Sequence, residues 1–205
     1  GNNMATRVVT SAWQAHLQRV QPGSCVFMLC DVQERFRNMI SHYPSVISVG
    51  NRMSSIASSL EIPLLVTEHY SKALGPTVEE IDTSRASVFQ KTKFSMITPE
   101  VNDFLGEERK TAVLYGIEAH VCILQTVLDL RNKGWGVFVV ADGTSSSRDW
   151  ERKIAFERIN NIGGVLTTSE SILFELLDNK DHPKFKECSS LLRAEQPDSG
   201  LSGLV

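Results

Sequence analysis

Long apolar runs are missing from this 205-residue sequence. The longest of them, at 24–30 and 136–141, are too short to cross a bilayer, which takes about 20 apolar residues in a helix. The N-terminus also lacks the charged-then-apolar pattern of a secretory signal. We therefore expect no membrane association and a cytoplasmic location by default, with an organelle as the alternative. Residues 1–3, which precede Met4, resemble a cloning remnant and are left out of fold reasoning.

Basic clusters and paired cysteines are missing as well. No run of Lys and Arg occurs and the net charge is −3, so nucleic acid is not an expected partner. The four cysteines show neither the density of a disulfide framework nor a C-x-x-C spacing, and they are typical of free thiols in a reducing compartment. They are Cys25, Cys30, Cys122 and Cys188.

Strand-like apolar runs alternate with amphipathic helical windows along most of the chain. This alternation predicts right-handed βαβ units and an α/β fold, a three-layer α/β/α domain with a mostly parallel six-stranded sheet. We place one domain at 6–194 and expect 195–205, rich in Pro, Gly and Ser, to be a mobile tail or an arm exchanged with a neighbouring subunit. The predicted strands are 25–30, 62–67, 87–89, 111–115, 137–141 and 165–166, and the main predicted helices are 46–60, 121–132, 149–160 and 169–177.

Three reactive side chains follow predicted strands. Asp31 comes directly after the first strand, Lys91 follows the run 87–89, and Cys122 lies shortly after the fourth strand, at the start of a helix. In parallel α/β sheets, ligands bind beyond the carboxyl ends of the strands. We therefore expect these three side chains to converge in space.

Cys122 carries the chemical argument. A thiol at a helix N-terminus lies at the positive end of the helix dipole, which favours the thiolate, and a nearby lysine strengthens the effect. A carboxylate such as Asp31 can accept the thiol proton and later deliver it to a leaving group. The spacing leaves a second interpretation open, in which Cys122 is a core residue and Asp31 a turn or cap residue.

Three motifs resemble, in order and spacing, the signatures of the isochorismatase-like hydrolase superfamily. The resemblance spans about residues 10 to 203. The short segments 75–78, 116–119 and 197–201 also resemble one branch of this superfamily. The motifs are Asp31-Val32-Gln33 with Phe36, Lys91 followed four residues later by Ser95, and Gly116-Ile117-Glu118-Ala119-His120-Val121-Cys122.

The resemblance implies a catalytic triad. Cys122 would be the nucleophile, Asp31 the general acid and base, and Lys91, rather than the nearby Lys93, the cation that stabilises the thiolate. It also implies a cis peptide between Ile117 and Glu118, and an oxyanion site formed by the backbone N–H groups of Glu118 and Cys122.

The implied activity is hydrolysis of a small-molecule amide or related C–N bond through a thioester. The segment 67–72 offers one carboxylate and one histidine, His69, which is too few for a metal site, so we expect no metal and no cofactor. Phe36 and His69 are expected to line the substrate pocket. His120 is expected to point away from the thiol, and Cys25, Cys30 and Cys188 to be structural cysteines without a matched partner.

Two further interpretations belong to other classes. The chain is alternatively an oligomeric scaffold or binding protein that keeps the fold with little or no catalysis. RNA processing has no basic patch or stacking motif to support it. The superfamily implies a homo-oligomer, a dimer or larger, whose other partner is the small-molecule substrate.

Overall fold

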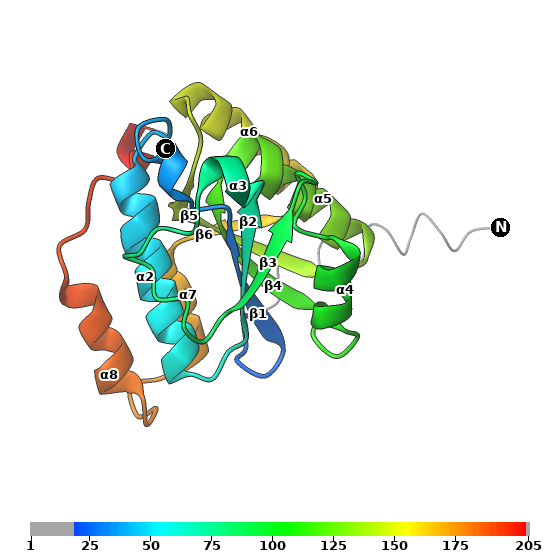
Figure 1. The fold of residues 1–205 in the computed structure, drawn as a ribbon. Coiled ribbons are helices and arrows are strands. Elements are labelled where there is room, and N and C mark those ends of the chain that lie inside the picture. Colours follow the sequence, from blue (N-terminus) through cyan, green and yellow to red (C-terminus); the bar gives the residue numbers. More distant parts are fainter. Residues whose placement is uncertain (1–18, 204–205) are drawn as a thin grey trace.

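Helices cover both faces of one parallel sheet in the computed structural model, which describes residues 19–203 (Figure 1). The strand order is β3-β2-β1-β4-β5-β6, and every neighbouring pair is parallel. The predicted α/β fold and three layers are confirmed, and the sheet is parallel throughout rather than mostly. The strands are β1 (Cys25–Cys30), β2 (Leu64–His69), β3 (Ser87–Lys91), β4 (Thr111–Ile117), β5 (Gly136–Ser145) and β6 (Val165–Thr167).

Each face of the sheet has its own helices and its own core. On one side lie α2 (Tyr43–Ser59), α7 (Ser169–Leu177) and α8 (Phe185–Ser190), and on the other α4 (Pro99–Leu105), α5 (Leu124–Asn132) and α6 (Asp149–Asn161), as Figure 1 shows. The short α3 (Ser71–Leu74) follows β2. Along the central strand β1, Phe27 packs into the first core and Met28 into the second. A strand buried on both faces therefore appears in the sequence as a continuous apolar run.

The strand order reverses direction between β1 and β4. The chain runs outward from β1 through β2 to β3, then returns to β4 on the other side of β1. In open α/β sheets this switch point is where loops diverge and a ligand crevice forms. Asp31, with a left-handed φ of 54°, follows β1 here, and the chain from β4 leads here to Cys122.

Gly116 is a position in β4 where the neighbouring strand β1 leaves no room for a side chain. It pairs with Cys30 and has a φ of 118°, a conformation that favours glycine. A Cβ atom at this position would lie 2.8 Å from the Cys30 amide nitrogen and closer still to its carbonyl oxygen. Residue 116 can therefore pair with Cys30 in this conformation only because it has no side chain.

The structure differs from the sequence prediction at β5, which ends at Ser145 rather than at 141. The polar residues at its end stay in the strand because tertiary contacts satisfy them. The Asp142 carboxylate accepts hydrogen bonds from the Ser169 amide and hydroxyl, and the Ser145 hydroxyl donates to the Ser41 carbonyl.

The C-terminal segment packs on its own chain. The buried Arg152 donates hydrogen bonds to the carbonyl oxygens of Ser199 and Ala141, and Leu201 packs against the core that contains Phe156. Its exchange between subunits stays a prediction, and residues 1–3 lie outside the described residues. Within residues 19–203, no helix combines the length and hydrophobicity needed to span a membrane.

Candidate active site

Asp31 is held at the end of β1 by two hydrogen bonds to its carboxylate. It is 2% exposed. The Thr67 hydroxyl donates to Oδ1 over 2.7 Å, and the Lys91 ammonium donates to Oδ2 over 2.6 Å. A carboxylate this deeply buried needs a paired cation, and Lys91 supplies it.

Lys91 ends β3, and its side chain is fully buried. Besides Asp31, its ammonium donates to the carbonyl oxygens of Lys93 (3.1 Å) and Phe94 (2.9 Å), and lies 3.8 Å from Cys122 Sγ. Burial lowers the pKa of Lys91, but the electrostatic attraction of Cys30, Asp31 and Cys122 outweighs burial, so the pKa is raised above its usual value. Lys91 is therefore a permanent cation beside the thiol.

Cys122 lies in a π-helical turn, Ala119–Ile123, that leads into α5. Its carbonyl accepts a 2.6 Å hydrogen bond from the Thr126 hydroxyl, which in turn accepts one from the Met96 amide. π turns of this kind occur often at functional sites. The Ile117–Glu118 peptide that precedes the turn is cis, at the position that the resemblance implies.

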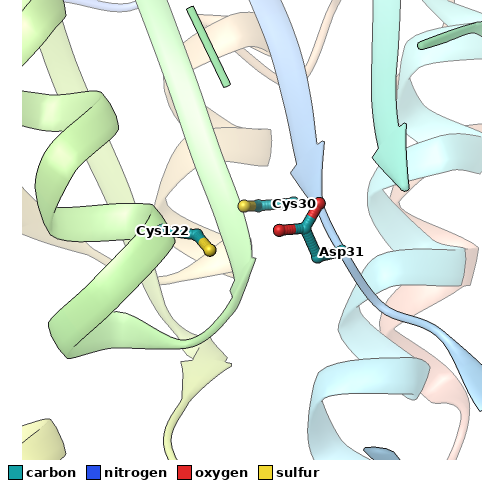
Figure 2. Close-up of side chains that lie close together, drawn as sticks. All are labelled: Cys30, Asp31 and Cys122. Carbon is teal, nitrogen blue, oxygen red and sulfur yellow. The ribbon is translucent and has the colours of Figure 1, made fainter. Parts of the chain in front are cut away.

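The reactive atoms form one cluster. The sulfur atoms of Cys30 and Cys122 and a carboxylate oxygen of Asp31 all lie within 4.8 Å of one another. Figure 2 shows the Cys30 sulfur directed toward Cys122, with the Asp31 carboxylate beside both. Three such atoms are potential metal ligands, but the buried ammonium of Lys91 opposes a second cation at this point.

A small cavity of about 100 Å³ opens onto this cluster. Cys122, 7% exposed, and Asp31 lie on its wall, together with Phe36 and His69 as the resemblance implies. Larger hollows elsewhere, such as one of about 330 Å³ between α6 and β6, contain none of the triad. The cavity wall consists of Asp31, Phe36, His69, Phe94, Ile117, Glu118, Val121 and Cys122.

His69 takes part in the cluster more closely than expected. Its Nδ1 atom lies 3.3 Å from the Lys91 ammonium, and its ring stacks on Phe94 with 5.7 Å between centroids. Burial, followed by the positive charge of Lys91, lowers the pKa of His69. A neutral imidazole can accept a hydrogen bond from the Lys91 ammonium at Nδ1 while its ring stacks on Phe94.

Two neighbours of the triad lie apart from it. Lys93, considered beside Lys91 in the motif, forms an exposed ion pair with Asp129 at 2.9 Å. His120 has Ser146 as its hydrogen-bond partner, at 3.0 Å, rather than Cys122. The neighbouring Glu68 is not free to bind a metal, because Thr77 and Gln90 donate hydrogen bonds to its carboxylate.

Sequence reasoning missed four residues of the site. Thr67 orients Asp31, Phe94 forms a wall, and Gln33 exchanges hydrogen bonds with the His69 backbone at 2.7 and 3.0 Å. The fourth, Cys30, was expected to have no matched partner. Cys30 is indeed a free, buried thiol, but its sulfur lies within 4.8 Å of that of Cys122, a neighbour that the sequence did not indicate. Gln33 and Phe94 lie within the recognised motifs, whereas Thr67 sits in an apolar run that gives no signal of its own.

Comparisons with known proteins show what this chain is similar to. The family model of the isochorismatase domain matches residues 25–171. Isochorismatase domain-containing protein 1 of Danio rerio is 47% identical over 92% of this chain and 68% of its own length. Isochorismatase domain-containing protein 2 of Homo sapiens is 42% identical over 95% of each chain. The solved structure of a protein named MAR1 ribonuclease, from Caenorhabditis elegans, superposes with a TM-score of 0.86 at 41% identity, covering 90% of this chain and 97% of that one.

Proposed function

This chain belongs to the isochorismatase family of hydrolase-like α/β proteins, and we propose that it cleaves a small-molecule amide or related C–N bond with Cys122 as nucleophile. One observation carries the proposal. A buried Asp31–Lys91 ion pair of 2.6 Å lies against the Cys122 thiol, with 3.8 Å between the ammonium and the sulfur, and both Asp31 and Cys122 lie on the wall of one cavity. Acid, base, cation and nucleophile are thus within reach of one bound carbonyl group.

The reaction proceeds in two acyl-transfer steps. The thiol proton passes to Asp31 as the sulfur attacks the substrate carbonyl, and an oxyanion forms. The C–N bond then breaks, and Asp31 returns the proton to the departing amine, leaving a thioester on Cys122. Water, deprotonated by Asp31, attacks that thioester, the C–S bond breaks to release the acid, and Asp31 returns the proton to the Cys122 sulfur. The backbone N–H groups of Glu118 and Cys122 are the proposed donors to the oxyanion.

Lys91 has an electrostatic role in both steps. Its charge offsets the negative charge that moves between Asp31 and Cys122, so neither anion is left alone in a buried site. Because its carbonyl acceptors on Lys93 and Phe94 fix the ammonium, little reorganisation is needed when charge shifts.

The cavity walls restrict the substrate. The cavity volume of about 100 Å³ is well below the roughly 300–1,000 Å³ of drug-binding pockets, so the cavity admits only a small acyl group. Phe36, Phe94 and Val121 make the wall largely apolar, and the Phe94 and His69 rings lie nearly parallel. We therefore propose a compact, uncharged acyl group with a planar or apolar part.

A second candidate, RNA cleavage, is favoured by the similarity to the protein named MAR1 ribonuclease. The site fits it less well. An RNA phosphate would need exposed cationic groups, whereas the Lys91 side chain is fully buried and already bonded to Asp31 and two carbonyl oxygens. The scaffold interpretation is the remaining alternative.

The test is intact-mass spectrometry of the wild type and of Cys122→Ala after incubation with a panel of small amides, including N-carbamoyl amines and nicotinamide, and with a mixed-sequence RNA. Cys188→Ala, which removes a thiol far from the cavity, is the matched control. We expect an acyl adduct or released amine with the wild type and the control, and neither with Cys122→Ala.

Two other outcomes would contradict the proposal. Cleavage of RNA that depends on Cys122 would favour the second candidate. Hydrolysis that persists in Cys122→Ala would remove the thiol from the mechanism. We also propose that the chain forms a homo-oligomer, which light scattering of the purified chain would test. A cytoplasmic location is proposed as well, and fluorescence imaging of the tagged protein would test it.

A further inference from the structure

Cys30 gives the nucleophile a second thiol as a neighbour. It is the last residue of β1, is fully buried, and precedes Asp31 directly. Its sulfur lies within 4.8 Å of both the Cys122 sulfur and an Asp31 oxygen (Figure 2). The proposed hydrolysis needs only one thiol, so the mechanism leaves Cys30 without a role.

The two thiols differ in their access to small molecules. Cys122 lies on the cavity wall, whereas Cys30 is sealed beneath it in the core that contains Met28 and Leu114. Burial, followed by hydrogen bonding with Cys122 and the charge of Asp31, raises the pKa of Cys30 well above its usual value. A solute in the cavity therefore meets the Cys122 sulfur first, and Cys30 stays a protonated reserve thiol until Cys122 has reacted.

We propose that Cys122 is a site of peroxide modification and that Cys30 resolves the oxidised sulfur by forming a Cys30–Cys122 disulfide. The proposal rests on the proposed function, because it takes Cys122 to be the reactive thiol. Hydrogen peroxide is the co-reactant, and the cavity of about 100 Å³ has room for a molecule of its size.

The chemistry balances in two steps. In the first, Cys122 passes its thiol proton to Asp31 and attacks peroxide, an S–O bond forms, the O–O bond breaks, and the departing hydroxide takes the proton back from Asp31 to become water. Sulfur is oxidised to the sulfenic acid and peroxide is reduced. In the second, Cys30 transfers its proton to Asp31 and attacks the sulfenic sulfur. An S–S bond forms, the S–O bond breaks, and the departing hydroxide takes the proton from Asp31 to become water.

The position of Asp31 makes the second step feasible. Its carboxylate lies near both sulfur atoms, so the same group that transfers protons in hydrolysis can deprotonate the buried Cys30. Disulfide formation then needs the two sulfur atoms to close the remaining gap by side-chain rotation. The product blocks the nucleophile and protects it from further oxidation to the irreversible sulfinic and sulfonic acids.

The experiment compares wild type with Cys30→Ala after treatment with a several-fold molar excess of hydrogen peroxide, by intact mass and peptide mapping. We expect the wild type to lose two hydrogen atoms, with the crosslink mapped to Cys30 and Cys122, and dithiothreitol to reverse the loss fully. Cys30→Ala should instead gain two or three oxygen atoms at Cys122, which dithiothreitol does not remove. Cys25→Ala and Cys188→Ala are the matched controls and should behave as the wild type.

Alkylation by iodoacetamide separates failure of this inference from failure of the proposed function. If Cys122 alkylates faster than Cys25 and Cys188 but peroxide takes it to the sulfinic acid with Cys30 still a free thiol, the inference is overturned and the hydrolase proposal stands. If Cys122 reacts no faster than Cys25, both are overturned. The wild-type peptide map decides the matter even where circular dichroism shows that Cys30→Ala is misfolded.

Discussion

Replacing Gly116 with alanine tests the close approach of β1 and β4 that holds the site together. The new Cβ atom would lie 2.8 Å from the backbone nitrogen of Cys30 and nearer to its oxygen, so backbone rather than a flexible side chain must move. The φ of 118° adds strain of about 1–3 kcal/mol. Overpacking against a fixed neighbour adds a further 1–3 kcal/mol, so we expect a loss of about 4 kcal/mol in the free energy of unfolding.

Two other glycines provide matched controls that separate backbone strain from overpacking, the two sources of the expected loss in stability. Gly134 has a φ of 79°, but no atom lies within 4 Å of the position that a Cβ would take, so Gly134→Ala should lose only about 1–2 kcal/mol from backbone strain. Gly23 also has open space and an ordinary φ, so Gly23→Ala should stay within about 0.5 kcal/mol of wild type.

Urea unfolding followed by the fluorescence of the buried Trp135 measures all three variants. With a denaturant slope of about 2 kcal/mol per molar, the Gly116→Ala midpoint should fall by about 2 M. If Gly116→Ala costs no more than Gly134→Ala, contact with the Cys30 backbone does not limit the spacing of the strands, and the account of this junction is refuted.

Three further predictions concern the polar groups of the site. Lys91→Met leaves the buried Asp31 carboxylate unpaired and should lower the free energy of unfolding by about 3–5 kcal/mol at neutral pH, measured by urea unfolding. A loss no larger than that of an exposed ion pair, about 1 kcal/mol, would contradict this. Thr67→Val removes the donor to Asp31 Oδ1 and should cost about 1–3 kcal/mol, whereas Thr67→Ser should restore most of it. Because the pKa of His69 is lowered in the folded state, the unfolded chain takes up the proton first as pH falls below about 6.5, and stability is lost. His69→Gln should therefore show a smaller fall in melting temperature between neutral pH and about pH 5 than the wild type, and an unchanged fall would refute this role.

The helices and strands that could be predicted from the sequence are those whose local hydrophobic pattern matches the burial that they have in the folded structure. β1 and α7 begin and end where the apolar pattern and the turn residues place them, at 25–30 and 169–177. The end of β5 could not be predicted, because Asp142 and Ser145 are typical of a turn until partners from distant segments satisfy them. Local patterns contain no information about partners over a hundred residues away, such as Ser41.

The candidate site also contains residues that could be predicted from the sequence and residues that could not. Asp31, Lys91 and Cys122 could be predicted to converge because each lies at or beyond the carboxyl end of a parallel strand, and the resemblance then selected Lys91 over Lys93. The roles of Thr67 and Cys30 could not be predicted, since both belong to apolar runs in which a hydroxyl or a thiol is an ordinary core side chain. Only the register of β1 against its neighbours, in which Cys30 pairs with Thr67 on one side and Gly116 on the other, brings them to the reactive atoms.

The reversal of strand order between β1 and β4 divides the site between two halves of the chain. Residues 25–91 contain Asp31 and Lys91, the proposed acid and cation, and residues 111–167 contain Cys122, the proposed nucleophile. A chain in which only one half-sheet has formed therefore holds either a proton shuttle without a nucleophile or a thiol without its cation. Under the proposed mechanism, catalysis requires the whole assembled sheet, so the reactivity of Cys122 would report on joining of the halves in a folding or fragment-complementation experiment.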